Sequence, residues 1–325
     1  DLSRDPRIEE VEPNYEYRLT DTRRGTTQRT APVNTPSENQ LLAIPTNDPQ
    51  RNGQWHLGRT NTEAAWEWLE ADGKEKWGDR AIVVAVVDSG VDYTHEDLAG
   101  NMWVNTGEIA GNNIDDDNNG IVDDVYGASF VGGESDHNGD PTDYNGHGTH
   151  VAGIIAAQGN NNLGVIGVAP NVQIMAVTSA QYTGVLTSAD ISEGILYAYN
   201  QGADIINMSF GGGARSTLQE EALATAFSSA VLIAAAGNDG NYNDDACGDT
   251  PAPMYPGAYT YVVGVMAEAQ SANSQGSWLT GFSNFDCTAK NAVEYDVMAP
   301  GQDILSTVPG GGYAAWDGTS MAAPV

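Results

Sequence analysis

The sequence predicts an α/β fold, with a mostly parallel central sheet and helices on both of its faces. From about residue 55 onward, short apolar runs alternate with amphipathic stretches, which is typical of βαβ units. The runs are often rich in β-branched residues and show no polar alternation, which indicates parallel strands buried on both faces. With 325 residues, 40% of them hydrophobic, the chain can build one large α/β unit or two domains.

Five apolar runs predict the strands of this sheet. They are AIVVAVV (81–87), VQIMAVT (172–178), ADIINMSF (203–210), AVLIAAAG (230–237) and YTYVVGVMA (259–267). Three segments between and beside them predict helices. The first, 149–158, follows a glycine-rich segment. The second, 188–202, starts with a Ser that serves as its cap and stops at Gly202. The third, 218–230, carries acids in its first turn, where the helix dipole favours them.

The charge balance excludes some partners. Thirteen Lys and Arg stand against 44 Asp and Glu, for a net charge of −31. Such a surface repels nucleic acid and anionic lipid and suits bound cations or a saline setting. No apolar run approaches the roughly 20 residues of a membrane span. We therefore expect a soluble monomer that binds neither nucleic acid nor membrane.

The chain has two cysteines, Cys247 and Cys287. Two are too few for a disulfide-stapled scaffold, and their spacing is not that of a zinc site. One bridge in a secreted protein and two free, buried thiols both remain open.

Four polar residues stand at the ends of predicted elements, where open α/β sheets place their sites. Asp88 directly follows the first strand, His147 lies between two glycines before a helix, Asn238 follows a strand, and Ser320 begins a helix. Singly, each is an ordinary cap, turn or surface residue. Together they supply a nucleophile, a base, a carboxylate that orients the base, and a donor for an oxyanion.

Several stretches around these residues give the chain a family resemblance. It resembles the subtilases, the subtilisin-like serine proteases, over roughly residues 50–325 and in the family's order Asp, His, Ser. The matching stretches are VAVVDSGVDYTHEDL (85–98), NGHGTHVAGIIAA (145–157), GVIGVAP (164–170), INMSFGG (206–212), AAAGNDG (234–240) and GTSMAAP (318–324).

The resemblance implies a three-layer, subtilisin-like α/β fold and a secreted serine endopeptidase that hydrolyses proteins or peptides. In that enzyme Ser320 attacks the scissile carbonyl, His147 takes and returns its proton, and Asp88 orients His147. Asn238 and the Ser320 N–H hold the oxyanion.

The resemblance also implies a substrate-binding segment, whose backbone pairs with extended substrate, and a pocket for an apolar or mixed side chain on the N-terminal side of the cleaved bond. The segment is Ser209, Phe210, Gly211 and Gly212, and the pocket is lined by it and by the stretch that contains Ala236 and Gly237.

The chain contains an acidic insert between Asp88 and His147. Asp115, Asp117, Asn119 and Gly120 fit positions 1, 3, 5 and 6 of a Ca²⁺ loop. Position 12 is Tyr126 rather than Glu, so the loop is not an EF-hand. The last carboxylate would come from Asp123 or Asp124, and a solvated acidic loop is the alternative. The resemblance implies a second, structural Ca²⁺ site, built from Asp48, Asp97, Asn161, Leu163 and Val165.

The two ends of the chain carry further expectations. Residues 5–18 resemble the last strand of the propeptide that inhibits subtilases, so the protein's own propeptide is an expected partner. We accordingly divide the chain into a propeptide remnant (1–20), a linker that contains the maturation cleavage region (21–47) and the catalytic domain (48–325). The cut itself is expected somewhere within 16–47. The family continues beyond the serine with a long helix, which six residues cannot form alone, so the catalytic domain is expected to be truncated at its C-terminal end.

Three alternative functions fit the sequence less well. An esterase with a lipase-like fold shows G-x-S-x-G and the order Ser, Asp, His, whereas this chain has Gly-Thr-Ser-Met-Ala and the opposite order. A nucleotide-binding fold would need G-x-G-x-x-G after the first strand, which is missing. A catalytically idle, calcium-binding scaffold is the third, and the intact Asp88, His147, Asn238 and Ser320 speak against it.

Overall fold

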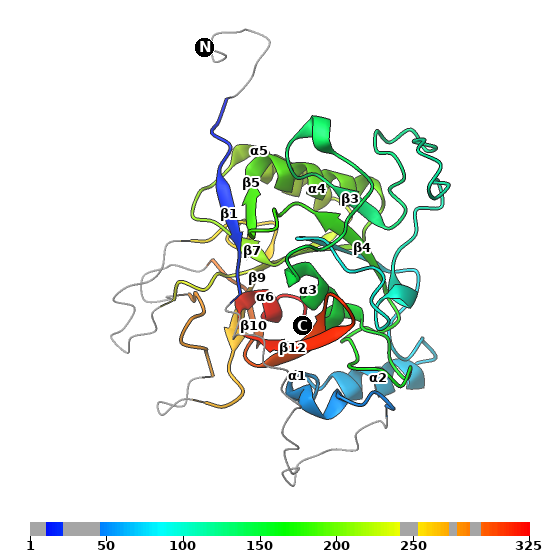
Figure 1. The fold of residues 1–325 in the computed structure, drawn as a ribbon. Coiled ribbons are helices and arrows are strands. Elements are labelled where there is room, and N and C mark those ends of the chain that lie inside the picture. The colour runs from blue at the N-terminus through cyan, green and yellow to red at the C-terminus, as the bar shows by residue number, and fades with distance from the viewer. Residues whose placement is uncertain (1–10, 22–45, 241–252, 273–277, 287–293) are drawn as a thin grey trace.

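The computed structural model describes residues 11–21, 46–240, 253–272, 278–286 and 294–325 (Figure 1). Its centre is a seven-stranded parallel sheet with the strand order β10-β9-β8-β6-β2-β4-β3. This confirms the predicted sheet. The strands are β2 (Val83–Asp88), β3 (Gly127–Ser129), β4 (Gln173–Thr178), β6 (Ile205–Met208), β8 (Val231–Ala235), β9 (Val263–Glu268) and β10 (Val297–Pro300).

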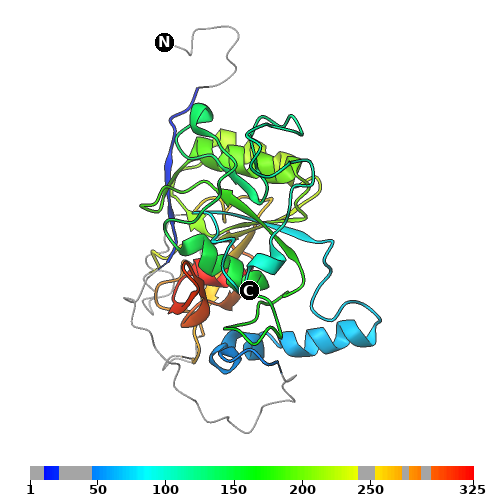
Figure 2. The same ribbon diagram turned by 45° about the vertical axis from the view of Figure 1, so that its right-hand side comes forward.

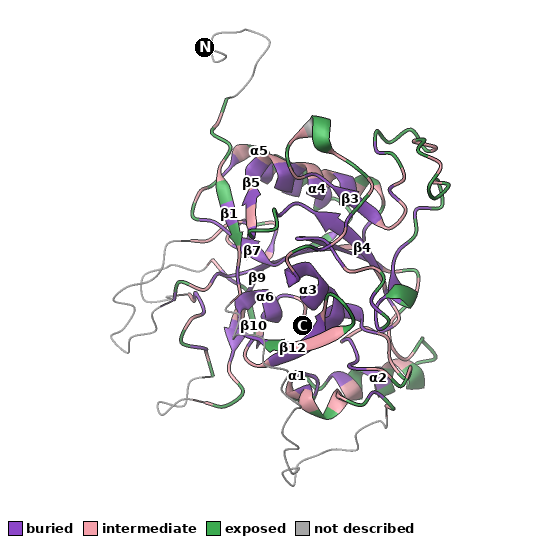
Figure 3. Cartoon of the chain, viewed as in Figure 1, coloured by how far each residue is buried: buried purple, intermediate pink, exposed green. Residues whose placement is uncertain are grey.

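Helices cover both faces of the sheet (Figures 1 and 2). On one face lie α4 (Ser188–Asn200) and α5 (Thr217–Ala226), and on the other lie α3 (His147–Ala156) and α6 (Thr319–Ala322). Alternate residues of β2 serve the two layers. Val83, Ala85 and Val87 pack in the cluster that contains the α4 and α5 side chains. Val84 and Val86 pack with those of α3 and α6. The central strand is therefore buried on both faces. Figure 3 shows the buried residues, in purple, concentrated in the sheet and on the helices that cover it.

The predicted helices exist, with shifted ends. The helix predicted over 149–158 begins two residues earlier, at His147 itself. The Ser cap predicted for the second helix is wrong, because the cap is Thr187, whose hydroxyl accepts a hydrogen bond from the Asp190 N–H. Ser216 caps the third helix in the same way.

A smaller sheet lies beside the main one. Its order is β5-β1-β7, and its middle strand β1 (Glu16–Leu19) comes from the N-terminal segment. The partners β5 (Val185–Thr187) and β7 (Phe210–Gly211) both run antiparallel to it. The run predicted as one strand over 203–210 is thus two, because β6 ends at Met208 before β7 begins in the smaller sheet.

Several elements were not predicted. Figure 1 shows α1 and α2 at one end of the molecule and a hairpin, β11–β12, next to α3. Among the described residues, none of the helices has the length and apolar character that crossing a membrane requires. Cys247 and Cys287 lie outside the described residues. The remaining elements are α1 (Trp55–Arg59), α2 (Thr62–Ala71), β11 (Ile304–Val308), β12 (Gly312–Trp316) and the 3-10 turns Arg51–Gly53, Ala99–Asn101 and Glu134–Asp136.

Candidate active site

The site forms where the chain order of the sheet reverses. From the central strand β2 the chain first builds β3 and β4 on one side and then β6, β8, β9 and β10 on the other. The carboxyl end of β2 therefore opens between two diverging connections, which is where open α/β sheets bind ligands. Asp88 is the last residue of β2, and His147 is the first residue of α3.

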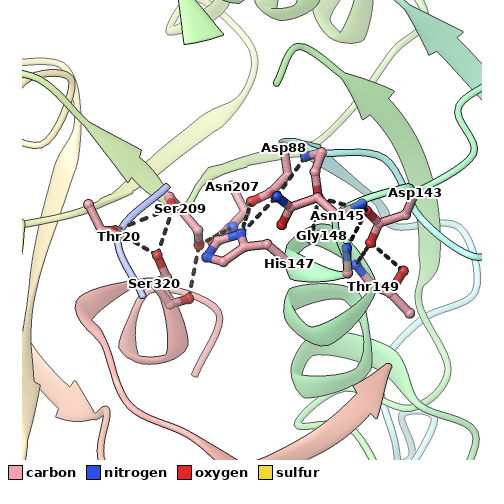
Figure 4. Close-up of polar contacts among 12 residues, drawn as sticks. Thr20, Asp88, Asp143, Asn145, His147, Gly148, Thr149, Asn207, Ser209 and Ser320 are labelled. Carbon is pink, nitrogen blue, oxygen red and sulfur yellow. Dashed lines mark hydrogen bonds and ion pairs between the residues drawn. The ribbon is translucent and has the colours of Figure 1, made fainter. Parts of the chain in front are cut away.

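Asp88 and His147 form a closed pair. The imidazole Nδ1 lies 2.7 Å and 2.9 Å from the two carboxylate oxygens. Both side chains are fully buried. A carboxylate at Nδ1 holds the proton on that nitrogen and so leaves Nε2 as the basic one. Figure 4 shows the ring between Asp88 on one side and Ser320 with Ser209 on the other.

Close packing of α3 against β2 makes this pair possible. A methyl group on Gly148 would lie 2.1 Å from the Gly90 carbonyl oxygen, so only glycine fits there. The Gly148 N–H donates to the Ser89 hydroxyl at 2.9 Å. This explains one of the two glycines that flank His147.

Asp143 secures the start of α3 and was not predicted from the sequence as a site residue. One carboxylate oxygen accepts from the Thr149 N–H and hydroxyl, and the other accepts from the Gly146 N–H and the Ser89 hydroxyl. Burial raises the pKa of Asp143, against the lowering effect of these hydrogen bonds. The available signal was its position: an acid four residues before His147, where the positive end of a helix dipole favours it.

The second histidine of α3 is not suited to the same work. Burial lowers the pKa of His150 to about 3. Its Nε2 lies 2.9 Å from the Ala314 carbonyl oxygen, and its ring stacks on Trp316 with 4.3 Å between centroids. His150 is therefore a packing residue.

Ser320 lies in the first turn of α6 and is fully buried. Its hydroxyl donates to the Ser209 carbonyl oxygen at 2.7 Å and lies 2.6 Å from the hydroxyl of Thr20, which follows β1 (Figure 4). The Ser209 hydroxyl in turn donates to the Ser320 carbonyl oxygen at 3.0 Å. Thr20 was not singled out from the sequence, because its place depends on a contact between residues 300 positions apart.

Asn238 is oriented so that its amide nitrogen is available. Its side-chain oxygen accepts from the N–H and the hydroxyl of Thr319, both at 2.9 Å. Its Nδ2 is buried and has no hydrogen-bond partner among the described residues. A methyl group on Gly318 would lie 3.3 Å from this nitrogen and 2.4 Å from the Thr20 carbonyl oxygen. The same oxygen accepts from the Ser320 N–H at 3.2 Å, and no hydrogen bond joins it to the Asn238 Nδ2.

The segment Ser209–Gly212 contacts β1 through its backbone. Leu19 pairs with Phe210 and Arg18 with Gly211, and the Thr20 N–H donates to the Ser209 carbonyl oxygen at 3.4 Å. A methyl group on Gly212 would lie 2.6 Å from the Tyr17 ring. The segment that was expected to pair with extended substrate thus pairs with an extended strand of the same chain.

Ala236 and Gly237 follow β8 and are packed next to α6. The Gly237 N–H donates to the Thr319 hydroxyl at 3.1 Å, and a methyl group on Gly237 would lie 2.8 Å from Met254 Cγ. Met254 also lies near Gly211, where a methyl group would be 3.0 Å from its Cε and 3.7 Å from Thr20 Cγ2. The Thr20 side chain therefore lies beside Gly211, on the same wall as Met254.

Residues 79–325 match the profile of the subtilase family. The chain belongs to this family. The match covers more than half of the chain and contains Asp88, His147, Asn238 and Ser320.

Named relatives of this subtilase are serine proteases. The chain is 33% identical over 325 residues to the thermophilic serine proteinase of Bacillus sp. (strain AK1), covering 99% of this chain and 62% of that protein. It is 39% identical to the intracellular serine protease of Paenibacillus polymyxa, over 75% of this chain and 64% of that protein. It is also 39% identical to subtilisin of Bacillus pumilus, over 75% of this chain and 73% of that protein. The chain therefore spans less than two thirds of the first two relatives.

The acidic insert of this subtilase gathers three carboxylates, of Glu108, Asp115 and Asp117. One oxygen from each lies within 4.8 Å of the others. Oxygens that bind one Ca²⁺ at 2.3–2.6 Å lie at most about 5 Å apart, so the cluster fits this ion. Asp115 and Asp117 were predicted as ligands, whereas Glu108, outside the loop pattern, was missed.

The other predicted residues of the insert have different surroundings. Asn119 donates through its N–H to Asp115 and Asp117 and through its side chain to Asp124. Asp123 accepts from the backbone N–H groups of residues 111–113. Asp124 is buried, accepts from the Tyr197 hydroxyl at 2.6 Å, and has a pKa raised by burial. These contacts shape the loop around the three carboxylates.

The second predicted calcium site contains two buried carboxylates. Asp97 accepts from the Asn161 side chain at 2.6 Å and from the Val165 N–H at 3.0 Å, and Asp48 accepts from the Asn161 N–H at 3.4 Å. Leu163 joins the loop by donating its N–H to the Asn161 side chain. Burial raises the pKa of Asp97. A divalent cation would offset the cost of burying these charges.

Proposed function

We propose that this subtilase is a secreted serine endopeptidase, made as a zymogen and stabilised by calcium. The single observation that supports the activity is the arrangement around Thr20. The Thr20 carbonyl oxygen accepts from the Ser320 N–H, and the Thr20 hydroxyl lies beside the Ser320 hydroxyl. The Asn238 amide nitrogen lies on the same side of the site, near Gly318, and Asp88 is hydrogen-bonded to His147.

In the proposed reaction the Ser320 oxygen attacks the carbonyl carbon of a bound peptide. His147 accepts the hydroxyl proton at Nε2 and gives it to the leaving amine, and Asp88 stabilises the imidazolium that forms in between. The negative charge that develops on the carbonyl oxygen is stabilised by the Ser320 N–H and by the Asn238 amide. Water then attacks the acyl-enzyme, His147 takes the proton of the water, and the same proton passes to the Ser320 oxygen as the ester bond breaks.

We infer broad sequence preference for the peptide substrate. Strand addition between β5 and β7 relies on main-chain hydrogen bonds, which every peptide can make. Ser209, Phe210, Gly211 and Gly212 supply one side of that strand. Ala236 and Gly237 carry no charge, which favours an apolar or mixed side chain on the N-terminal side of the cleaved bond.

The zymogen proposal rests on what fills the site. The strand β1 and Thr20 occupy the position in which substrate would pair, so no other peptide can bind there until they leave. We accordingly propose a propeptide remnant over 1–20, a linker over 21–47 and the catalytic domain over 48–325, with the protein's own propeptide as a partner.

Secretion is the proposed location. Calcium sites of modest affinity fill in extracellular fluid, where this ion is abundant, and a net charge of −31 keeps such a protein soluble and away from acidic surfaces. We propose that it acts as a monomer.

Calcium removal is expected to destabilise the protein. Each site contributes about 2.7 kcal/mol when the free ion is at 100-fold excess over its Kd, so two sites contribute about 5 kcal/mol and excess chelator should lower the Tm by about 5 °C or more. Calorimetry with and without EDTA measures this.

Single variants separate the two calcium sites. Asp97→Asn and Asp115→Asn should each remove part of the calcium dependence, whereas Glu67→Gln, an exposed acid on α2, should leave it intact. A Tm that does not respond to chelator would argue against both sites.

The proposed activity is tested with the full-length protein. We expect turnover of casein and stoichiometric labelling by a fluorophosphonate, since both need a serine activated by a base. A folded protein that does neither but binds calcium would instead be the idle scaffold.

A further inference from the structure

We propose that the bond between Thr20 and Asp21 is the one at which this subtilase cleaves its own chain, and that the buried side chain of Tyr17 sets this register. The inference rests on the proposed peptidase function and adds to it the bond, the sequence recognised and the first residue of the mature enzyme.

The first observation is the placement of Thr20. Its carbonyl oxygen accepts from the Ser320 N–H at 3.2 Å, and its hydroxyl lies 2.6 Å from the Ser320 hydroxyl. A methyl group on Gly318 would lie 2.4 Å from the same carbonyl oxygen and 3.1 Å from the Asp21 Cα. The peptide unit that faces the nucleophile is therefore the one that joins Thr20 to Asp21.

The second observation is the hydrogen bonding that leads to this unit. The Leu19 N–H donates to the Gly184 carbonyl oxygen at 3.1 Å, on the β5 side, and the Thr20 N–H donates to the Ser209 carbonyl oxygen, on the β7 side. Residues up to Thr20 thus follow the strand pairing of a bound peptide without a break. Pairing in β1 itself joins Tyr17 to Leu186 and Arg18 to both Val185 and Gly211.

The third observation is the pocket around Tyr17. Its side chain is fully buried, its hydroxyl donates to the Ala214 carbonyl oxygen at 2.8 Å, and its ring meets the edge of Phe210 with 6.4 Å between centroids. The flanking residues Glu16 and Arg18 are exposed. A shift of the strand by one residue would bury one of these charges in the pocket, so the register is strongly specified.

Two further contacts hold the segment in the same register. Glu12 accepts from the Thr217 and Leu218 N–H groups in the first turn of α5. Burial alone would raise the pKa of Glu12, but these hydrogen bonds lower it. Asn14 accepts from the Ala189 N–H in the first turn of α4. Together with Tyr17 they fix three points upstream of Thr20.

The cleavage step balances without any added reagent except water. The Ser320 oxygen bonds to the Thr20 carbonyl carbon, its proton passes through His147 to the Asp21 nitrogen, and the Thr20–Asp21 bond breaks. Water then adds to the ester carbon, and its proton returns through His147 to the Ser320 oxygen. The products are a carboxylate at Thr20 and an amine at Asp21.

The test is the first residue of the active protein. The full-length protein is allowed to mature, and its N-terminus is determined by Edman degradation and intact-mass spectrometry. We expect Asp21. An enzyme that turns over casein and yet begins, at its earliest cut, at a different residue overturns this inference while it leaves the peptidase function standing. Absence of casein turnover would instead contradict the proposed peptidase function.

The register is tested by two variants. With an alanine inserted between Thr20 and Asp21, the cut should stay directly after Thr20, because the three upstream contacts are unchanged. A cut that moves to stay directly before Asp21 would contradict the role of Tyr17.

Tyr17→Asp should slow the first cut by about tenfold or more, the loss expected for a buried aromatic anchor. Glu16→Gln, an exposed neighbour, should not slow it. Both variants release a mature enzyme of identical sequence, so equal casein turnover after maturation shows that folding was intact. An unchanged rate in Tyr17→Asp would also count against the inference.

Discussion

Ser320→Ala is expected to lower kcat for peptide hydrolysis by about 10⁶-fold, the loss known when the serine of a subtilisin triad is removed. Alanine leaves no atom that can form the acyl-enzyme, so labelling by a fluorophosphonate should vanish as well. The fold should persist, because the hydroxyl makes few contacts: one hydrogen bond to the Ser209 carbonyl oxygen and one to the Thr20 hydroxyl. Because this variant cannot cut the Thr20–Asp21 bond, β1 also stays paired in the site, so no residual turnover is expected.

The measurement is casein or peptide turnover by the purified full-length variant. Ser228→Ala, which removes an exposed serine after α5, is the matched control and should keep full activity. Equal turnover by the Ser320 variant would remove the proposed mechanism.

The sheet could be predicted from the sequence because its strands are buried on both faces. A run such as VVAVV in β2 is apolar at every position, which is the pattern of a strand covered on both faces. All six residues of this strand are indeed buried. The four residues of the candidate site were likewise visible, since each follows or begins such an element. Their approach in space then follows from the rule that parallel strands bring their carboxyl ends together.

Other parts could not be predicted because their signals are weak or non-local. The helix α2 buries only Thr62 and Trp66, so its apolar stripe is too narrow to identify. Glu108 joins Asp115 and Asp117 only through the fold of the insert, outside any loop pattern. The contact of Thr20 with Ser320 depends on pairing between strands far apart in the chain, which explains why sequence alone left the cleaved bond open over residues 16–47.

Asn238→Ala is expected to lower kcat by about 10²- to 10³-fold and to change KM little, the usual effect of removing one oxyanion donor. The donor acts on charge that develops only in the transition state, and so it contributes little to binding the ground-state peptide. The structure makes the prediction specific to one atom. The side-chain oxygen is already used by Thr319, at 2.9 Å from its N–H and its hydroxyl, and the buried Nδ2 is left for the substrate.

A second variant separates this role from the positioning of α6. Asn238→Asp keeps an oxygen that can accept from Thr319 but replaces the amide donor with a carboxylate oxygen. If Asn238 acts as an oxyanion donor, the aspartate variant should lose at least as much kcat as the alanine variant, because its charge would also repel the oxyanion. If Asn238 only positions Thr319 and the start of α6, the aspartate variant should be nearly as active as the parent protein. A change confined to KM in both variants would deny Asn238 the oxyanion role.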